Sequence, residues 1–209
     1  MKRKKNGAPP WRTVLSALLL CMTNYSESAL CRDAAREEAA LARAFASYSA
    51  PAVVLLDASG GRGRFDQLLA EERPVILQFI FTSCTTICGV MASTLAAAND
   101  ELGKLNGDYL ALSVTIDPEY DTPERLKEFS EYFPSNPHWR LLTGRLADIQ
   151  SVLKAFDAQF DGALKMNHQA YTFLRAAPGR PWLRIEGLMS APQLIAEYKK
   201  LLDHANDPR

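Results

Sequence analysis

Two cysteines, Cys84 and Cys88, are separated by three residues in the stretch FTSCTTICGV, residues 81–90. Thiolates are soft ligands that favour Cu(I) and zinc, and two neighbouring thiols can also form a disulfide. A disulfide across so short a loop restrains little of the unfolded chain, so the pair suits chemistry better than structural support. A closed zinc site needs four ligands. The spacing therefore favours a redox pair or, with a third ligand, a trigonal copper site.

Three histidines are candidates for that third ligand. His168 lies in KMNHQAYTFL, directly before an expected strand, whereas His138 follows Pro137 in an expected loop and His204 lies in the last expected helix. A structural role is expected for His138 and a surface position for His204. A lone histidine is more often structural than a metal ligand, but its position next to a core strand makes His168 the candidate.

The elements that must hold these residues alternate between strand and helix. The run VILQFIF (75–81) is almost continuously apolar, as in a strand that is covered on both faces, and YLALSVTI (109–116) is expected to be a second buried strand. Between them, VMASTLAAANDEL (90–102) has the alanine and leucine content of a helix. Thr122 and Pro123 are typical of an N-cap and a first helical residue, so they predict another helix after the second strand.

Shorter patterns complete the domain. The expected elements are a strand at 52–57, a short helix at 65–72, a strand at 138–144, a helix at 146–156, a hairpin of 170–174 and 182–187 that turns at Pro178 and Gly179, and a closing helix capped by Ser190. This order predicts an α/β fold with a central mixed sheet and helices on both faces. A core strand that runs into a cysteine pair at a helix start is thioredoxin-like. If that start is helical, the two thiols share one face, and the free N–H groups stabilise a thiolate.

The first 28 residues have the pattern of a secretory signal peptide or an N-terminal anchor. A basic start precedes a short apolar run at 14–22 and small residues near position 28. The run is too short to span a bilayer comfortably. We therefore expect an exported protein of the periplasm or cell envelope, with a membrane tether through the N-terminus as an alternative. Residues 29–51, which include Cys31, are expected to form a tether, and residues 52–205 the domain. Cys21 falls within the leader.

The charge of the remaining chain argues against a nucleic-acid partner. After residue 28 there are 19 basic and 23 acidic residues, a net charge of −4. The one basic cluster lies in the leader, so nothing in the domain provides the basic surface that nucleic acids require.

Three stretches together resemble the Sco/SenC family of thioredoxin-like, copper-binding proteins of cytochrome c oxidase assembly. They are FIFTSCTTIC, LSVTIDPEYDTPERLKEF and NHQAYTFL, in that order, and the resemblance covers about residues 53–203. It implies that Cys84, Cys88 and His168 bind one copper, as Cu(I) or Cu(II). It also implies a metallochaperone that delivers copper to, or reduces the cysteines of, the CuA centre. Asp117 matches a family aspartate near the site, with either a supporting role behind the ligands or a cap before Pro118.

Two positions depart from the usual pattern of this family. Gly89 stands where a proline commonly follows the second cysteine, and Asn167 stands where an acidic residue commonly precedes the histidine. Glycine does not fix the backbone at a helix start as proline does. A neutral neighbour also raises the basicity of a histidine ligand less than a carboxylate does. These departures bear on copper affinity and partner identity more than on the fold.

Other readings of the cysteine pair remain open. A thiol–disulfide oxidoreductase of the cell envelope would use the pair without copper, but such enzymes have a two-residue spacer and a cis-proline, and residues 138–177 contain no proline. A peroxidase is a third possibility, because Thr82-Ser83-Cys84 resembles a peroxiredoxin site without its proline and arginine. A structural disulfide is the fourth. If the protein is a copper metallochaperone, its expected partners are the CuA subunit or another copper acceptor, and a thiol reductant of the thioredoxin type.

Overall fold

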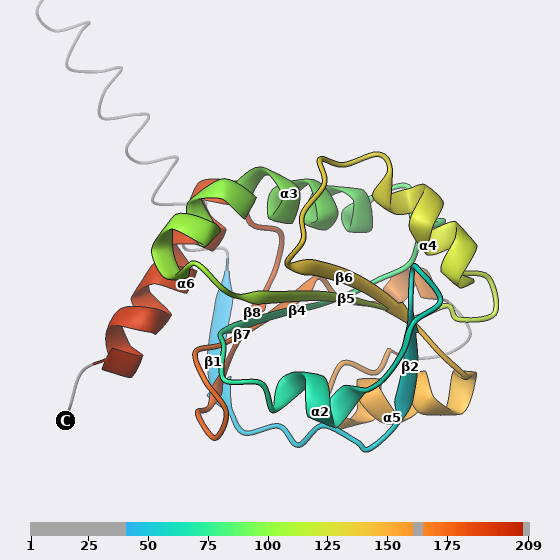
Figure 1. Ribbon diagram of the computed structural model, residues 1–209, viewed down its shortest axis with the longest axis horizontal. Helices are drawn as coiled ribbons and strands as arrows, with labels where there is room; N and C mark the ends of the chain where they lie inside the picture. Colours follow the sequence, from blue (N-terminus) through green and yellow to red (C-terminus); the bar gives the residue numbers. More distant parts are fainter. Residues whose placement is uncertain (1–40, 161–164, 207–209) are drawn as a thin grey trace, which may run out of the picture. The chain divides into compact units, whose positions relative to one another are not determined.

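The computed structural model describes residues 41–160 and 165–206, which form one mixed eight-stranded sheet with helices on both faces (Figure 1). The sheet order is β1-β8-β7-β4-β5-β6-β2-β3. The strands are β1 (Ala42–Ala46), β2 (Val54–Asp57), β3 (Arg62–Arg64), β4 (Val75–Ile80), β5 (Leu110–Thr115), β6 (Trp139–Thr143), β7 (Tyr171–Arg175) and β8 (Trp182–Glu186). The helices are α2 (Phe65–Leu69), α3 (Ile87–Asn106), α4 (Pro123–Ser130), α5 (Leu146–Ala155), the 3₁₀ turn η1 (Lys165–Asn167) and α6 (Ala191–Asn206).

The centre of the sheet is formed by the two strands with the most continuous apolar runs. Every residue of β4 and β5 is buried, and the two strands are parallel. The sheet is parallel again between β5 and β6, and antiparallel between β4 and β7. The predicted fold class and the predicted β7–β8 hairpin are therefore confirmed, and the hairpin turn contains Gly179 with φ +76°.

Two apolar layers hold the helices to the sheet. On one face, Leu95 and Leu102 of α3 and Tyr198 of α6 pack with Ile76 of β4. On the other face, α2 and α5 cover an aromatic cluster around Phe156, and Figure 1 shows these two helices opposite α3. Full burial of one such side chain stabilises the fold by about 1.5–3 kcal/mol. The sheet is thus fixed from both sides, and the loops at the carboxyl ends of β4 and β5 project from a rigid frame.

Helix boundaries follow local chemistry. Thr122 caps α4, because its side-chain oxygen accepts a hydrogen bond from the Arg125 N–H at 3.4 Å, with Pro123 in the first turn, as predicted. Helix α3 ends at Gly107, whose φ of +67° is in the left-handed region that glycine adopts most readily. Helix α3 starts at Ile87, three residues before the expected start.

The expected tether at 29–51 differs from the structure in the part that is described. Residues 42–46 form β1, an edge strand that pairs antiparallel with β8. The sheet thus includes residues before position 52, because pairing with β8 provides the hydrogen bonds that this alanine-rich segment needs in strand form. The predictions for residues 1–28 and 29–40 concern positions outside the described residues. In residues 41–160 and 165–206, no helix has both the length and the apolar content to cross a membrane.

Candidate metal and redox site

The loop between β4 and α3 carries the first cysteine. Because α3 begins at Ile87, Cys84 lies before the helix, and the expected helical turn from Cys84 to Cys88 is not formed. Cys84 instead ends a tight turn after β4, in which its N–H donates to the carbonyl of Phe81 at 3.2 Å, and residues 85–86 are not helical. The two side chains still interact, because Cys88 lowers the pKa of Cys84 and Cys84 raises the pKa of Cys88. The spacing therefore brings the thiols together by a loop and not by helical periodicity.

The two thiols have opposite electrostatic environments. Cys84 is partly exposed, and Cys88 is fully buried. Partial burial is the largest influence on Cys84 and raises its pKa, but hydrogen bonds from the Thr86 hydroxyl, at 3.4 Å, and from the backbone N–H groups of Cys88 and Thr86 outweigh it, so that the pKa falls to about 7. Burial raises the pKa of Cys88 far above its ordinary value, although the Phe81 N–H donates to its sulfur at 3.5 Å. Cys84 is thus the reactive thiolate and Cys88 its protonated neighbour.

His168 lies against the buried thiol. Its Nε2 is 3.7 Å from Cys88 Sγ, and its Nδ1 is 3.0 Å from the carbonyl oxygen of Lys165. A carbonyl only accepts, so Nδ1 carries the proton and the lone pair of Nε2 faces the sulfur. Burial lowers the pKa of His168, so the ring is neutral near pH 7. A neutral imidazole whose Nδ1–H is held by a carbonyl is the usual form of a metal-binding histidine.

These residues fit a soft metal in chemistry, with two sulfurs and one nitrogen. In the part of the chain that the structure describes, no three His, Cys, Asp or Glu side chains already stand in ligating geometry. Cys88 and His168 are in contact, and the third donor, Cys84, sits on an exposed loop. A metal held by all three would therefore require a local rearrangement of the site.

A buried carboxylate that the sequence analysis missed holds the cysteine loop. Asp121 is completely buried and accepts hydrogen bonds from the Thr82 N–H at 3.1 Å, from the Thr82 hydroxyl at 2.5 Å and from the Thr115 hydroxyl at 2.5 Å. Its charge also contributes to the raised pKa of Cys88. The signal in the sequence was a second aspartate four residues after Asp117, within DPEYD.

Asp117 itself contacts neither cysteine through any bond in the described residues. Its carboxylate pairs with the ammonium group of Lys165, the residue whose carbonyl holds His168. The Lys165 ammonium also lies 5.3 Å from the centre of the Phe81 ring, and Phe81 contacts the His168 ring at 5.3 Å between centroids. Asp117 is thus linked to the site through Lys165, a residue that the sequence analysis did not single out.

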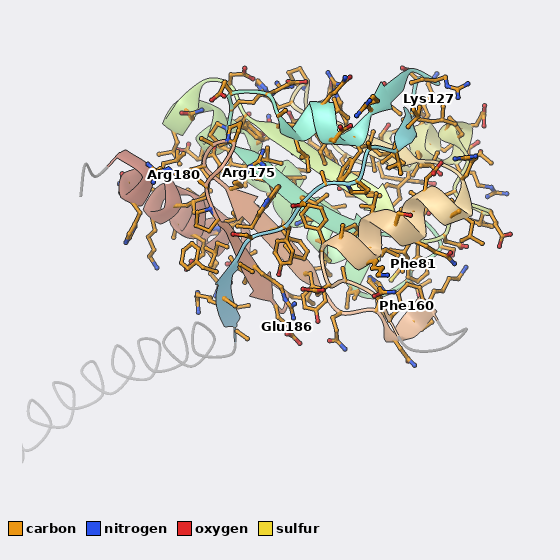
Figure 2. The ribbon with its side chains drawn as sticks, turned by 90° about the horizontal axis from the view of Figure 1, so that it is seen from below. Phe81, Lys127, Phe160, Arg175, Arg180 and Glu186 are labelled. Atoms are coloured by element: carbon orange, nitrogen blue, oxygen red, sulfur yellow. The ribbon has the colours of Figure 1, made fainter. Side chains whose placement is uncertain are left out.

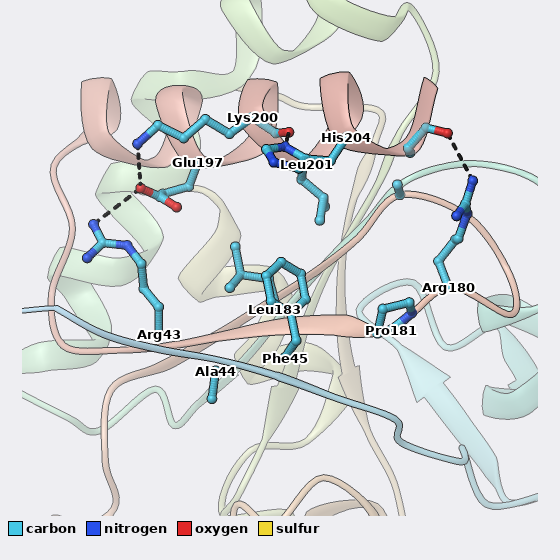
Figure 3. Close-up of a pocket in the computed structure, with 12 residues that line it drawn as sticks. Arg43, Ala44, Phe45, Arg180, Pro181, Leu183, Glu197, Lys200, Leu201 and His204 are labelled. Atoms are coloured by element: carbon cyan, nitrogen blue, oxygen red, sulfur yellow. Dashed lines mark hydrogen bonds and ion pairs between the residues drawn. The ribbon is translucent and has the colours of Figure 1, made fainter. Parts of the chain in front are cut away.

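The remaining histidines and the apolar groove lie apart from this site. His138 stacks on Tyr109 with 4.7 Å between ring centroids, a structural role as expected, and His204 is exposed on α6 as expected. Figure 3 shows a groove of about 320 Å³ between β1 and α6, and none of Cys84, Cys88 and His168 lines it. In Figure 2, Arg180 of this groove lies at the opposite side of the molecule from Phe81. The residues of the candidate site therefore lie together near the carboxyl ends of β4 and β5.

Comparisons of sequence and of structure with known proteins point to the same family. The family model SCO1/SenC matches residues 53–203. A SCO2-like protein of Rickettsia felis is 32% identical over 154 residues, which cover 70% of this chain and 73% of that protein. A solved structure of BsSco, described as a member of the Sco family of cytochrome c oxidase assembly proteins with a disulfide switch, is 26% identical at a TM-score of 0.62, covering 77% of this chain and 96% of that one. Copper-bound ScoI of Arabidopsis thaliana has a TM-score of 0.62 at 23% identity, covering 75% and 99% of the two chains.

Proposed function

We propose that this chain, which belongs to the SCO1/SenC family, is a copper metallochaperone whose ligands are Cys84, Cys88 and His168. Copper is its cargo, held by few ligands so that an acceptor can take it by exchange. The acceptor is the CuA subunit of cytochrome c oxidase or another copper protein. The similarity to copper-bound ScoI of Arabidopsis thaliana and to BsSco, a member of the Sco family of cytochrome c oxidase assembly proteins, supports this proposal.

The observation that carries the proposal is the contact between His168 Nε2 and Cys88 Sγ at 3.7 Å. The two residues are 80 positions apart in sequence, Cys88 in the first turn of α3 and His168 directly after η1. A neutral imidazole with its lone pair directed at a thiol, beside a second thiol with a pKa of about 7, is a soft donor set of low coordination number. Cu(I) favours such donors.

The dithiol is the form that can hold copper. A thiolate is the ligand, so oxidation of the pair to a disulfide removes two of the three donors. Loading the chaperone therefore requires prior reduction, for which a thiol reductant of the thioredoxin type is a suitable partner. In transfer, a sulfur of the acceptor replaces one ligand at a time, and the partly exposed thiolate of Cys84 is the first that an incoming group can reach.

An anaerobic copper titration of the reduced full-length chain tests this proposal. Cys21 and Cys31 are first replaced by serine, so that the only thiols are those of the site. We expect one Cu(II) per chain with sulfur-to-copper charge-transfer absorption, and loss of that absorption on His168→Ala. His204→Ala is the matched control, since this histidine is exposed on α6. Equal spectra for the two histidine variants would refute the ligand set.

A second function is favoured by the unequal pKa values of the two thiols. A thiolate near pH 7 beside a protonated buried thiol is the arrangement of an attacking and a resolving cysteine. The Cys84 thiolate would attack a partner disulfide to give a mixed disulfide. Cys88 would then lose its proton and attack Cys84, which forms the internal disulfide and releases the partner as a dithiol. The same pair could in this way reduce the cysteines of a copper acceptor.

The two functions differ in their dependence on His168. Reduction of a model disulfide with a copper chelator present needs both cysteines and no metal. If His168→Ala keeps this reaction and wild type binds no copper, the chain is a thiol–disulfide oxidoreductase. If wild type binds copper through His168, the metallochaperone proposal stands and exchange chemistry serves it. For location, the leader pattern at 1–28 supports the periplasm or cell envelope.

A further inference from the structure

Lys165 controls the orientation of the His168 ring through its backbone. The carbonyl oxygen of Lys165 accepts from His168 Nδ1 at 3.0 Å and from the His168 backbone N–H at 3.3 Å. These two bonds fix both the position of the residue and the tautomer of its ring. The direction of Nε2 toward Cys88 therefore depends on where Lys165 is held.

The side chain of Lys165 holds that position. It begins in the single turn η1 and reaches the loop after β5, where its ammonium group pairs with Asp117 across 48 positions of sequence. The same ammonium lies 5.3 Å from the ring centre of Phe81 and 5.8 Å from that of Tyr120. Lys165 thus ties the short turn that carries His168 to the carboxyl ends of β4 and β5.

The far end of this contact is itself anchored to the cysteine loop. The Asp117 backbone N–H donates to Thr115 Oγ1 at 2.9 Å, and the Thr115 hydroxyl donates to Asp121. Asp121 in turn accepts from Thr82, two residues before Cys84. A continuous set of bonds therefore joins the histidine segment to the cysteine loop.

We propose that Lys165 is a positioning residue: its ion pair with Asp117 and its carbonyl contact with His168 together place the imidazole beside the cysteine pair, and opening of the ion pair releases His168 from the site.

The exposure of the pair fits this role. The side chain of Lys165 is 39% exposed and that of Asp117 16%. Water can reach the ammonium group, so the pair can open without unfolding of the sheet. While the pair is closed, Nε2 stays at the cysteines. When it is open, the turn Lys165–Asn167 is held by fewer contacts and the imidazole can leave. This release step rests on the proposed function, because it lowers the ligand number from three to two during copper transfer.

Four variants test the role. Lys165→Met keeps the length of the side chain and removes its charge, and Asp117→Asn removes the opposite charge. A double variant with Lys165→Asp and Asp117→Lys restores an ion pair in reverse. Lys104→Met is the matched control, because Lys104 forms an ion pair with Glu101 at 2.6 Å on the exposed face of α3.

The first readout needs no copper. Nitrogen-15 NMR of the imidazole rings in the reduced full-length protein reports the tautomer directly, and His168→Gln assigns the signal. We expect one Nδ1-protonated form in wild type and in Lys104→Met. We expect the two nitrogen shifts to move toward each other in Lys165→Met and in Asp117→Asn, and to recover in the double variant. Unchanged His168 signals in both single variants would overturn the proposal.

The second readout is copper affinity in the same set. Loss of a group that holds a metal-binding histidine typically weakens affinity by about 10–100-fold, so we expect about tenfold weaker binding in each single variant. We expect recovery in the double variant and no change in the control. If wild type binds no copper, the proposed function fails, and the imidazole signals still decide the role of Lys165. If copper binds and the signals do not move, the role of Lys165 fails and the proposed function stands.

Discussion

The buried carboxylate of Asp121 provides the sharpest test of how the cysteine loop is held. Three donor groups converge on it, namely the backbone N–H and hydroxyl of Thr82 and the hydroxyl of Thr115. Asp121→Ala removes the acceptor and leaves these donors without a partner. A buried donor left unpaired costs about 1–3 kcal/mol. The Thr82 hydroxyl is partly exposed and can bond to water instead. The full cost of an unpaired donor therefore applies to the Thr82 N–H and the Thr115 hydroxyl. We expect a loss of about 2–6 kcal/mol in the free energy of unfolding.

Asp121→Asn separates the charge from the shape. The amide oxygen can still accept from Thr82, and its NH₂ group can donate to the Thr115 hydroxyl, which is able to accept. Only the charge-assisted part of the bonds is lost, and we expect a cost of about 1–2 kcal/mol. The graded order of wild type, asparagine and alanine is therefore the signature of hydrogen bonding at this position.

Urea unfolding of the reduced, copper-free protein measures both variants. With a slope of about 2 kcal/mol per molar urea, the alanine variant should unfold at a midpoint about 2 M lower than wild type. Asp66→Ala is the control, because this carboxylate pairs with Arg64 on the surface, and its midpoint should match that of wild type. An alanine variant within about 1 kcal/mol of wild type, or equal costs for alanine and asparagine, would refute the reasoning.

Three further outcomes are expected from single positions. Because the pKa of Cys84 is lowered to about 7, its thiolate is present above that pH and lost below it. Alkylation of Cys84 followed by mass spectrometry should therefore show a rate that falls about tenfold for each pH unit below 7. A pH–rate curve with its midpoint near pH 9 would contradict the lowered pKa. Thr86→Val removes the hydroxyl that donates to Cys84 and should move this midpoint upward, while Thr85→Val should leave it in place. Gly89→Ala has open space for its Cβ inside α3 and should stabilise the fold by about 0.5–1 kcal/mol in urea unfolding, whereas Gly107→Ala, at φ +67°, should destabilise it by about 1 kcal/mol.

The central strands could be predicted because burial on both faces leaves a direct mark on the sequence. Every residue of β4 and β5 is buried, and nine of their twelve residues are apolar. Strand β1 leaves no such mark. Its sequence, ARAFA, is largely exposed, and its strand form depends on pairing with β8, more than 130 residues away. Tertiary pairing, not local propensity, decides that element.

The cysteine loop could be predicted in content but not in geometry. Alanine and leucine predict α3, yet the two threonines before Ile87 are β-branched and have low helix propensity, so the helix begins after them. The spacing predicts one helical turn between Cys84 and Cys88, but residues 84–86 form a non-helical loop. The position of His168 before β7 was expected, and the structure brings it to Cys88. The roles of Lys165 and Asp121 could not be predicted, since each depends on contacts between residues that are 48 and 39 positions apart.

The unequal burial of the donors sets an order for any exchange at this site. Cys88 is 0% exposed and His168 is 5% exposed, so an incoming group cannot reach either one without movement of the chain. Cys84 is accessible and ionises near pH 7. Whether the incoming group is an acceptor's thiolate or a reductant, its first bond must therefore involve Cys84 or its ligand position. His168 can leave only if its segment moves, and the one side chain that ties this segment to the loop after β5 through an ion pair in the described residues is Lys165. Exchange thus begins at the partly exposed thiol of Cys84. It is completed when the ion pair between Lys165 and Asp117 opens and releases His168.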